Sequence, residues 1–337
     1  MSIRTLVRLA LMLTIPAVLA AQTYTVTDLG AVFGNFSGAR GINATGQVTG
    51  YSANNSGSSI VFLYSSGKMS DLGSLGGTNA IGLAINSSGE VAGYSTLSDG
   101  SYRGFFSSNG QLISVGTLAG SYSDAEGIND AGQVVGASST ASGEIHPYLY
   151  SNGQLTDLGG LGGSGTNLWN SAEGVNKSGQ VVGYSWTPQT LHAFLWTNGV
   201  MKDLGSLPGN YSQGFAVNDL GQVTGISYTG RKLRNYADAF LYTNGKMQDL
   251  GTIGGQYSWG FGINNLGVVV GQSAFTLNSS SYHAFVYLNG KMQDLNKLIP
   301  AHSGWVLETA YSINDAGQIV GYGTLNKQQR AFLLTPN

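Results

Sequence analysis

The chain has 337 residues, of which 9% are charged and 10% aromatic, with 52 glycines, no cysteine and a formal net charge of −2. An average soluble domain has about 25% charged residues, and this chain has no basic stripe of the kind that nucleic-acid binding requires. The absence of cysteine excludes disulfides and thiolate metal ligands. Many glycines among regularly spaced apolar runs indicate many short strands joined by tight turns.

The first 21 residues have the features of a secretory signal peptide. Arg4 and Arg8 form a positive start, the stretch from Leu9 to Leu19 is apolar, and small residues lead to a cleavage site expected after Ala20 or Ala21. The apolar run is shorter than the roughly 20 residues that span a bilayer, which disfavours an uncleaved anchor. We therefore predict a secreted or periplasmic protein without a membrane span after cleavage.

A core of the form I/V-N-x-x-G-Q-V-x-G-x-S recurs seven times in the rest of the chain. Its asparagines are Asn43, Asn86, Asn129, Asn176, Asn218, Asn264 and Asn314. The spacings are 43, 43, 47, 42, 46 and 50 residues, which is close to the length of one propeller blade.

Each unit resolves into four short strands, shown best by the fourth copy. The first strand ends at Val175, and the others cover Gln180 to Ser185, His192 to Trp196, and Met201 to Gly205. The N-x-x-G turn between the first two strands suits a left-handed glycine. Asn-Gly pairs, such as Asn198-Gly199, separate the last two strands and are a strong hairpin signal.

The two ends of the chain indicate a closed ring. The last unit stops after its third strand, Arg330 to Leu334, and the missing fourth strand stands at the start of the chain as Tyr24 to Gly30. An open stack gains nothing from this offset, whereas a ring uses it to join the first strand to the last blade. We predict an all-β, seven-bladed β-propeller of four-stranded blades that forms a single domain over residues 22–337.

The units resemble the HAF-type extracellular repeat of bacterial exported proteins. His192-Ala193-Phe194 and His283-Ala284-Phe285 match the triplet that gives this repeat its name, and weaker copies include Ala239-Phe240, Ala331-Phe332 and His146-Pro147-Tyr148. The resemblance covers essentially the whole mature chain. It implies export and a propeller-like architecture, and it supplies no catalytic residues.

If the fourth strand is outermost, the N-x-x-G and N-G turns share one face of the ring. The opposite face then carries the loops from strand two to strand three and the crossovers between blades. These loops vary from unit to unit: Ser52 to Ser59, Trp186 to Leu191, and Tyr228 to Ala237, which contains Arg231, Lys232, Arg234 and Tyr236. A uniform face beside a variable one is typical of a scaffold that presents a binding surface, although neutral drift of loops explains the variation equally well.

Aromatic residues recur in the crossovers, seven positions before the asparagine. They are Phe36, Tyr122, Trp169, Tyr211 and Tyr257, with Trp259 and Trp305 close to this position in their units. Aromatic rings around a channel mouth could stack on sugar faces. The candidate ligand-binding residues are therefore Trp169, Trp259, Trp305, Tyr122, Tyr211 and Tyr257. The alternative, packing between blades, is favoured for the set as a whole.

The residue three positions before the asparagine differs between units. It is Arg40, Leu83, Glu126, Glu173, Phe215, Phe261 and Tyr311 in chain order. We expect Arg40, Glu126 and Glu173 to converge in the channel, where they could act as acid and base or hold a polar ligand. Solvation of a wet channel is the favoured alternative.

The histidines give no basis for a metal site. His146, His192 and His283 occupy one slot in three different units, and His302 stands alone. We expect the aspartate of the repeated D-L-G to be a hydrogen-bond acceptor at the end of its strand. No calcium loop, phosphate loop or nucleophile elbow is present, and we expect no cofactor.

The sequence favours a monomeric, non-catalytic binding module for a glycan or an envelope component. One alternative is a propeller-type polysaccharide lyase or hydrolase that uses the channel carboxylates. Another is a surface scaffold or adhesive protein without a discrete ligand.

Overall fold

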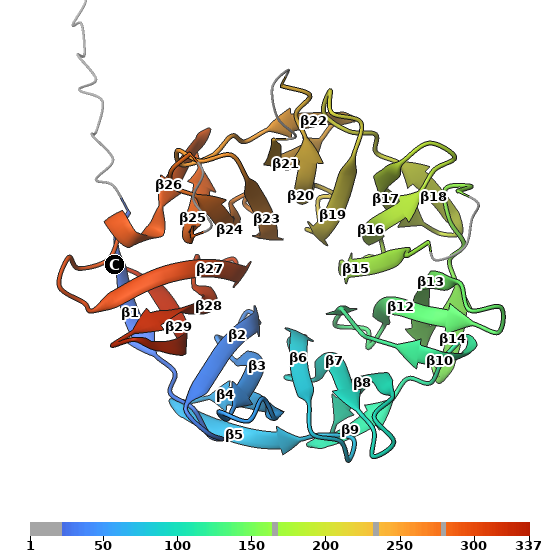
Figure 1. Ribbon diagram of the computed structural model, residues 1–337, viewed down its shortest axis with the longest axis horizontal. Helices are drawn as coiled ribbons and strands as arrows, with labels where there is room; N and C mark the ends of the chain where they lie inside the picture. The colour runs from blue at the N-terminus through green and yellow to red at the C-terminus, as the bar shows by residue number, and fades with distance from the viewer. Residues whose placement is uncertain (1–21, 164–167, 232–235, 278–280) are drawn as a thin grey trace, which may run out of the picture.

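Seven antiparallel β-sheets surround a central channel in the computed structural model (Figure 1), which describes residues 22–163, 168–231, 236–277 and 281–337. The residues expected to form the signal peptide lie outside this part of the chain. In each sheet the first strand of the unit lies at the channel and the fourth lies at the rim.

The first three blades follow the chain from residue 36 to residue 157. Blade 1 contains β2 (Phe36–Ile42), β3 (Val48–Ala53), β4 (Ser59–Ser65) and β5 (Lys68–Gly73). Blade 2 contains β6 (Ala80–Ile85), β7 (Val91–Thr96), β8 (Tyr102–Ser108) and β9 (Gln111–Ser114). Blade 3 contains β10 (Ala119–Ser123), β11 (Gly127–Ile128), β12 (Val134–Thr140), β13 (Ile145–Ser151) and β14 (Gln154–Asp157). Its innermost strand is thus broken in two.

The remaining blades complete the ring. Blade 4 contains β15 (Ser171–Val175), β16 (Val181–Trp186), β17 (Leu191–Thr197) and β18 (Val200–Asp203). Blade 5 contains β19 (Ser212–Val217), β20 (Val223–Tyr228), β21 (Ala237–Thr243) and β22 (Lys246–Asp249). Blade 6 contains β23 (Ser258–Ile263), β24 (Val269–Ala274), β25 (Tyr282–Leu288) and β26 (Lys291–Asp294), and the 3₁₀ turn η1 (Leu295–Lys297) follows. Blade 7 contains β27 (Trp305–Ile313), β28 (Ile319–Leu325), β29 (Gln328–Pro336) and β1 (Tyr24–Asp28).

The N-terminal strand closes the ring, as the sequence predicted. β1 pairs antiparallel with β29 over five residue pairs, from Tyr24 with Pro336 to Asp28 with Phe332. Tyr24 is buried in the core of blade 7, and Leu29 is buried beside blade 1. The predicted seven-bladed β-propeller is therefore confirmed.

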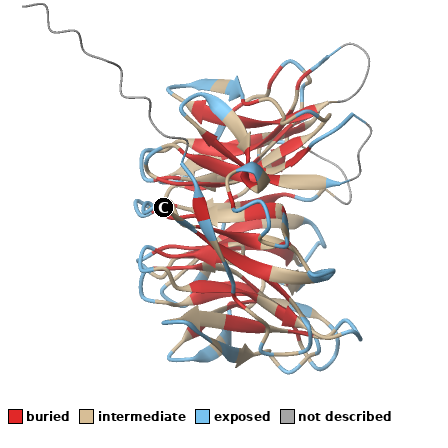
Figure 2. Cartoon of the chain, turned by 90° about the vertical axis from the view of Figure 1, so that its left-hand side faces the viewer, coloured by how far each residue is buried: buried red, intermediate tan, exposed pale blue. Residues whose placement is uncertain are grey.

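The core lies between neighbouring blades. The third strand of every blade places one aromatic ring there with no exposed surface: Phe62, Phe105, Tyr148, Phe194, Phe240, Phe285 and Phe332. This is the phenylalanine slot of the H-A-F triplet. Figure 2 shows that buried strand segments run through the thickness of the disc, while exposed residues gather at the turns.

Antiparallel order also fixes the two faces of the disc. The turns between strands one and two and between strands three and four lie on one face, which we call the turn face, and all other connections lie on the loop face. The Asn-Gly hairpins adopt the positive φ that their turn type needs, for example 49° at Asn198 and 90° at Gly199. In the described part of the chain, no helix is long and apolar enough to cross a membrane.

Candidate functional site

The seven repeat asparagines form a continuous ring at the turn-face end of the channel. Each side-chain amide donates a hydrogen bond to the backbone carbonyl of the asparagine in the next blade, at 2.9–3.3 Å, and Asn314 closes the circle on Asn43. Each Oδ1 atom accepts from the backbone N–H four residues later, at 2.9–3.0 Å. We call this set the asparagine ring. One side chain therefore shapes its own turn and joins two blades.

Small residues bring the inner strands close together just before the asparagine ring. A Cβ atom built on Gly127 would lie 3.1 Å from the Cα of Gly174 in the next blade. One on Gly262 would lie at the same distance from the Cα of Ser312. A larger side chain at these positions would push neighbouring blades apart, so the channel is narrow here.

A β-bulge interrupts the inner strand at the residue that precedes each of these small residues. The register with strand two shifts there in blades 1, 2, 4, 5, 6 and 7, and in blade 3 the strand breaks between β10 and β11. A bulge leaves one residue unpaired and re-aims its side chain. The unpaired residues are those whose identity differs from unit to unit in the sequence.

These seven side chains line one cavity of about 210 Å³ in the middle of the channel. We call them the bulge ring: Arg40, Leu83, Glu126, Glu173, Phe215, Phe261 and Tyr311. Arg40, Glu126 and Glu173 thus line the same space, as expected from the sequence. The other side of the ring is aromatic, with ring centroids 5.6 Å apart for Phe215 and Phe261 and 5.1 Å apart for Phe261 and Tyr311.

The carboxyl groups of the bulge ring lie in an environment that disfavours their charge. Burial is the main cause, and it raises the pKa of Glu173 to about 7. Burial, followed by repulsion from Glu173 and Asp124, raises the pKa of Glu126 well above its ordinary value. Within the described residues no cation lies within 4 Å of either glutamate. Both carboxyls therefore hold their protons more strongly than ordinary glutamic acids do.

Arg40 leans away from the glutamates toward blade 7. Its guanidinium carbon lies 3.8 Å from the centroid of the Tyr311 ring and 6.0 Å from that of Tyr51, so it stacks on Tyr311. Its Nε atom is buried and has no hydrogen-bond partner. An unpaired buried donor is costly and marks a place where a ligand atom or water is needed.

A third acid, Asp124, lies just toward the loop face from the bulge ring. Its carboxylate accepts hydrogen bonds from the Tyr122 hydroxyl, at 2.5 Å, and from the backbone of Ala137, at 2.6 Å. Burial raises the pKa of Asp124 to about 6, and these hydrogen bonds oppose the rise. The carbonyl of Asp124 accepts from the Tyr148 hydroxyl. The broken inner strand of blade 3 is thus built around this aspartate.

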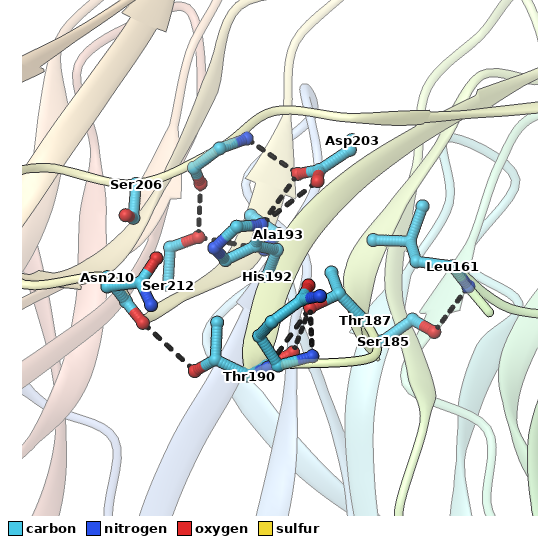
Figure 3. Close-up of polar contacts among 12 residues, drawn as sticks. Leu161, Ser185, Thr187, Thr190, His192, Ala193, Asp203, Ser206, Asn210 and Ser212 are labelled. Atoms are coloured by element: carbon cyan, nitrogen blue, oxygen red, sulfur yellow. Dashed lines mark hydrogen bonds and ion pairs between the residues drawn. The ribbon is translucent and has the colours of Figure 1, made fainter. Parts of the chain in front are cut away.

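Histidines make polar contacts within single blades, and serines make hydrogen bonds across the seams between neighbouring blades. His146, His192 and His283 each contact through Nδ1 the aspartate that ends the fourth strand of their own blade, at 2.8–3.0 Å. That aspartate also accepts from the backbone two residues later, as expected. At the seam in Figure 3, Ser212 of blade 5 accepts from the N–H of Ala193 in blade 4. No group suited to a metal ion occurs among the described His, Asp and Glu residues.

The structure distributes the candidate aromatic residues over separate places. Their aromatic contacts include Tyr122 with Trp169 at 5.2 Å, Trp259 with Tyr282 at 5.3 Å and with Tyr257 at 5.9 Å, and Tyr211 with Tyr228 at 4.5 Å. Trp305 is the first residue of β27, a strand that runs from the rim to the channel (Figure 1), and it lines a surface pocket with Thr25 and Val26 of β1. They therefore form pairs instead of one ring around the channel mouth.

One of these groups is exposed and continuous across three blades. The ring of Tyr102 lies between Tyr94, at 5.9 Å, and Tyr122, at 6.4 Å, and Tyr122 meets Trp169 edge to face. Tyr102 and Trp169 are both 42% exposed. We call Tyr102, Tyr122 and Trp169 the aromatic corner, because their planes are inclined by 50° and 67°.

Hydrogen bonds fix the aromatic corner in place. Asp124 holds the hydroxyl of Tyr122, and Arg103 donates to the carbonyl oxygens of Tyr102 and Ser121, which joins blade 2 to the crossover of blade 3. Tyr102, Arg103 and Asp124 were not among the site residues predicted from the sequence. Asp124 was detectable as the one carboxylate at its position, where the other units have Gly, Ile, Ser, Gln, Trp and Thr. Of the basic residues in the longest loop, Lys232 and Arg234 lie outside the described residues, and Arg231 bridges Asp238 and Asp249 at 2.9 and 3.2 Å.

The solved structures to which this chain is similar include β-propellers. The β-propeller domain of the Trilobed protease from Pyrococcus furiosus, described as having an open velcro topology, matches with a TM-score of 0.56 and 9% identity over 90% of this chain and 96% of that one. A puromycin-hydrolyzing peptidase from Mycobacterium tuberculosis matches with a TM-score of 0.54 and 11% identity over 89% of this chain and 49% of that one. TolB from Acinetobacter baumannii gives a TM-score of 0.49 at 9% identity, over 86% of this chain and 63% of TolB. No protein-family model matches the chain, and no curated protein matches it.

The fold and the channel together define the class of protein, which is a seven-bladed β-propeller. Within that class, the chain is one whose ring is closed by its own first described strand and whose channel is built from an asparagine ring and a bulge ring. Identities of 9–11% support the fold alone.

Proposed function

We propose that the protein is an exported, HAF-type binding module that recognises a carbohydrate of the cell envelope or its surroundings at the aromatic corner. The observation that carries this proposal is the pre-positioned group on the loop face that the exposed Tyr102 and Trp169 form with the half-buried Tyr122. Large solvent-exposed aromatic side chains that occur together are characteristic of binding sites.

The chemistry of the corner fits a sugar. Aromatic rings offer an apolar face to the C–H groups of a pyranose, while Tyr and Trp keep a polar handle for hydroxyl groups. The inclined planes of Tyr122 and Trp169 allow contact with a sugar from two sides. Because Asp124 and Arg103 already hold the corner, binding loses less conformational entropy than it would at mobile side chains.

A glycan array followed by titration of the best ligand tests this proposal. Trp169→Ala and Tyr102→Ala should each weaken binding at least about tenfold, which corresponds to about 1.4 kcal/mol. Trp259→Ala and Trp305→Ala are matched controls, because they remove tryptophans on other parts of the molecule. Unchanged affinity in both corner variants would contradict the proposed site.

The same experiment separates the alternatives. Release of new reducing ends from the bound glycan would favour a lyase or hydrolase that uses Glu126 and Glu173. If no glycan binds and the protein still adheres to envelope material, a scaffold without a discrete ligand is the better description.

A further inference from the structure

The bulge ring is acidic on one side and aromatic on the other. Two glutamates stand on blades 3 and 4, and two phenylalanines stand on blades 5 and 6. The cavity between them measures about 210 Å³, which leaves room for a small molecule. Nothing in the fold requires these residues, because Leu83 and Arg40 occupy the equivalent positions in blades 2 and 1.

Glu126 and Glu173 are half-buried, and both line this cavity. No hydrogen bond to the side chain of Glu126 exists within the described residues, and burying an unpaired carboxylate is expensive. Six further ionisable groups interact electrostatically with the pair: Arg40 on β2, Tyr94 on β7, Tyr122 on β10, Asp124 beside β10, Tyr148 on β13 and Tyr184 on β16. Only Arg40 is cationic, and it stacks on Tyr311 instead of pairing with either glutamate. No cation therefore pairs with the two glutamates, and the charge of Arg40 lies on the blade 7 side of the cavity.

We propose that the bulge ring binds a small organic cation of the ammonium type, with Glu126 and Glu173 facing its charge and Phe215 and Phe261 covering its apolar groups. Carboxylates supply charge complementarity, and aromatic faces attract an alkylammonium through their quadrupole. A hydrated divalent metal ion fits this lining less well, because half of it offers no oxygen ligand. This site is separate from the aromatic corner and does not depend on the carbohydrate proposal.

The position of Arg40 contributes to selectivity. It covers the Tyr311 ring, so the uncovered aromatic surface is that of Phe215 and Phe261. A bound ammonium group should therefore lie against Phe215 and Phe261 and away from Arg40.

Calorimetric titration with choline and ethanolamine, against the neutral isostere 3,3-dimethyl-1-butanol, tests the proposal. At pH 8 at least one cation should bind at least about tenfold tighter than the neutral alcohol. Affinity should fall by a similar factor at pH 5, where the carboxyls are protonated. Near pH 7 binding should release protons, so the measured heat should depend on the ionisation enthalpy of the buffer.

Four variants locate the site. Glu126→Gln and Glu173→Gln should each weaken the cation about tenfold or more, and Phe261→Leu should weaken it about two- to fivefold. Leu83→Met is the control in the same ring and should change affinity less than twofold. Trp169→Ala should leave cation binding intact, so failure of the carbohydrate proposal and failure of this one are distinguishable.

Equal binding of the alcohol and the cations, or no binding of either cation, would overturn the proposal. So would cation affinity that is independent of pH and unchanged in the glutamate variants. If a glutamine variant does not fold, Phe261→Leu and the pH dependence of the unaltered protein decide the question.

Discussion

The asparagine ring and the bulge ring lie three residues apart along the same seven repeat units, yet the first contains one residue type and the second contains five. Each asparagine must satisfy the backbone of its own turn and donate to the next blade, and other side chains of similar size do not offer a donor and an acceptor in that geometry. A bulge residue points into open space and satisfies no backbone group. Uniformity therefore marks the positions that close the ring, and variation marks those free to meet a ligand.

Removing β1, the strand that closes the ring, should have the largest effect on the stability of the fold. Deletion of residues 23–30 takes away five ladder pairs and the buried side chains of Tyr24 and Leu29, each worth about 1.5–3 kcal/mol. We expect a loss on the order of 5 kcal/mol and association through the uncovered edge of β29. Denaturant unfolding and size-exclusion chromatography measure both. Thr27→Ala, an exposed position of the same strand, is the control, and a monomeric deletion variant of unchanged stability would contradict closure by β1.

Breaking the asparagine ring at one blade should have the next largest effect. Asn176→Ala removes the acceptor for the N–H groups of Ser178 and Gln180 and the donor to the Asn218 carbonyl. Because Asn176 is buried and its hydrogen bond to the Asn218 carbonyl is buried as well, we expect a loss of about 2–3 kcal/mol in the free energy of unfolding. Lys177→Ala, at the exposed neighbouring position, should change it by less than about 0.5 kcal/mol. A similar small effect in both variants would show that the ring is incidental.

The contrast between the two rings explains what the sequence could predict. Asn-Gly pairs, the D-L-G aspartates and the offset of Tyr24 to Gly30 each reflect a local backbone requirement. Local requirements repeat with the unit, so strand number, strand order and closure were all predictable. The convergence of Arg40, Glu126 and Glu173 followed from the same periodicity.

The geometry of the candidate sites was not predictable in the same way. The bulge that aims Glu173 into the channel is a register shift, which no residue pattern in the repeat specified. The aromatic corner depends on Tyr102, which stands in a strand of the preceding blade and meets Tyr122 only through the curvature of the ring. Trp305 was predicted near the channel mouth but does not lie there, because β27 is longer than the other inner strands and begins toward the rim. Contacts between units depend on blade packing, and a repeat pattern within units does not record them.

We expect Glu173→Gln to raise the free energy of unfolding at pH 8, whereas Asn176→Ala lowers it. The change should also be smaller than that of Asn176→Ala. The pKa of Glu173 is about 7 in the folded protein against an ordinary value of 4.5, so between these values the folded state binds more protons than the unfolded state. Its contribution to stability therefore falls as pH rises from about 4.5 to 7 and stays low above pH 7. The glutamine variant lacks this loss and should be more stable than the unaltered protein at pH 8, by on the order of 2 kcal/mol, and equally stable at pH 4. Unfolding measured in both proteins across this range checks the sign, and a variant that is less stable at pH 8 would show that the ionised carboxylate supports the fold. A higher free energy of unfolding at pH 8 would instead show that the bulge ring lowers the stability of the unliganded protein. A bound cation should then restore that stability.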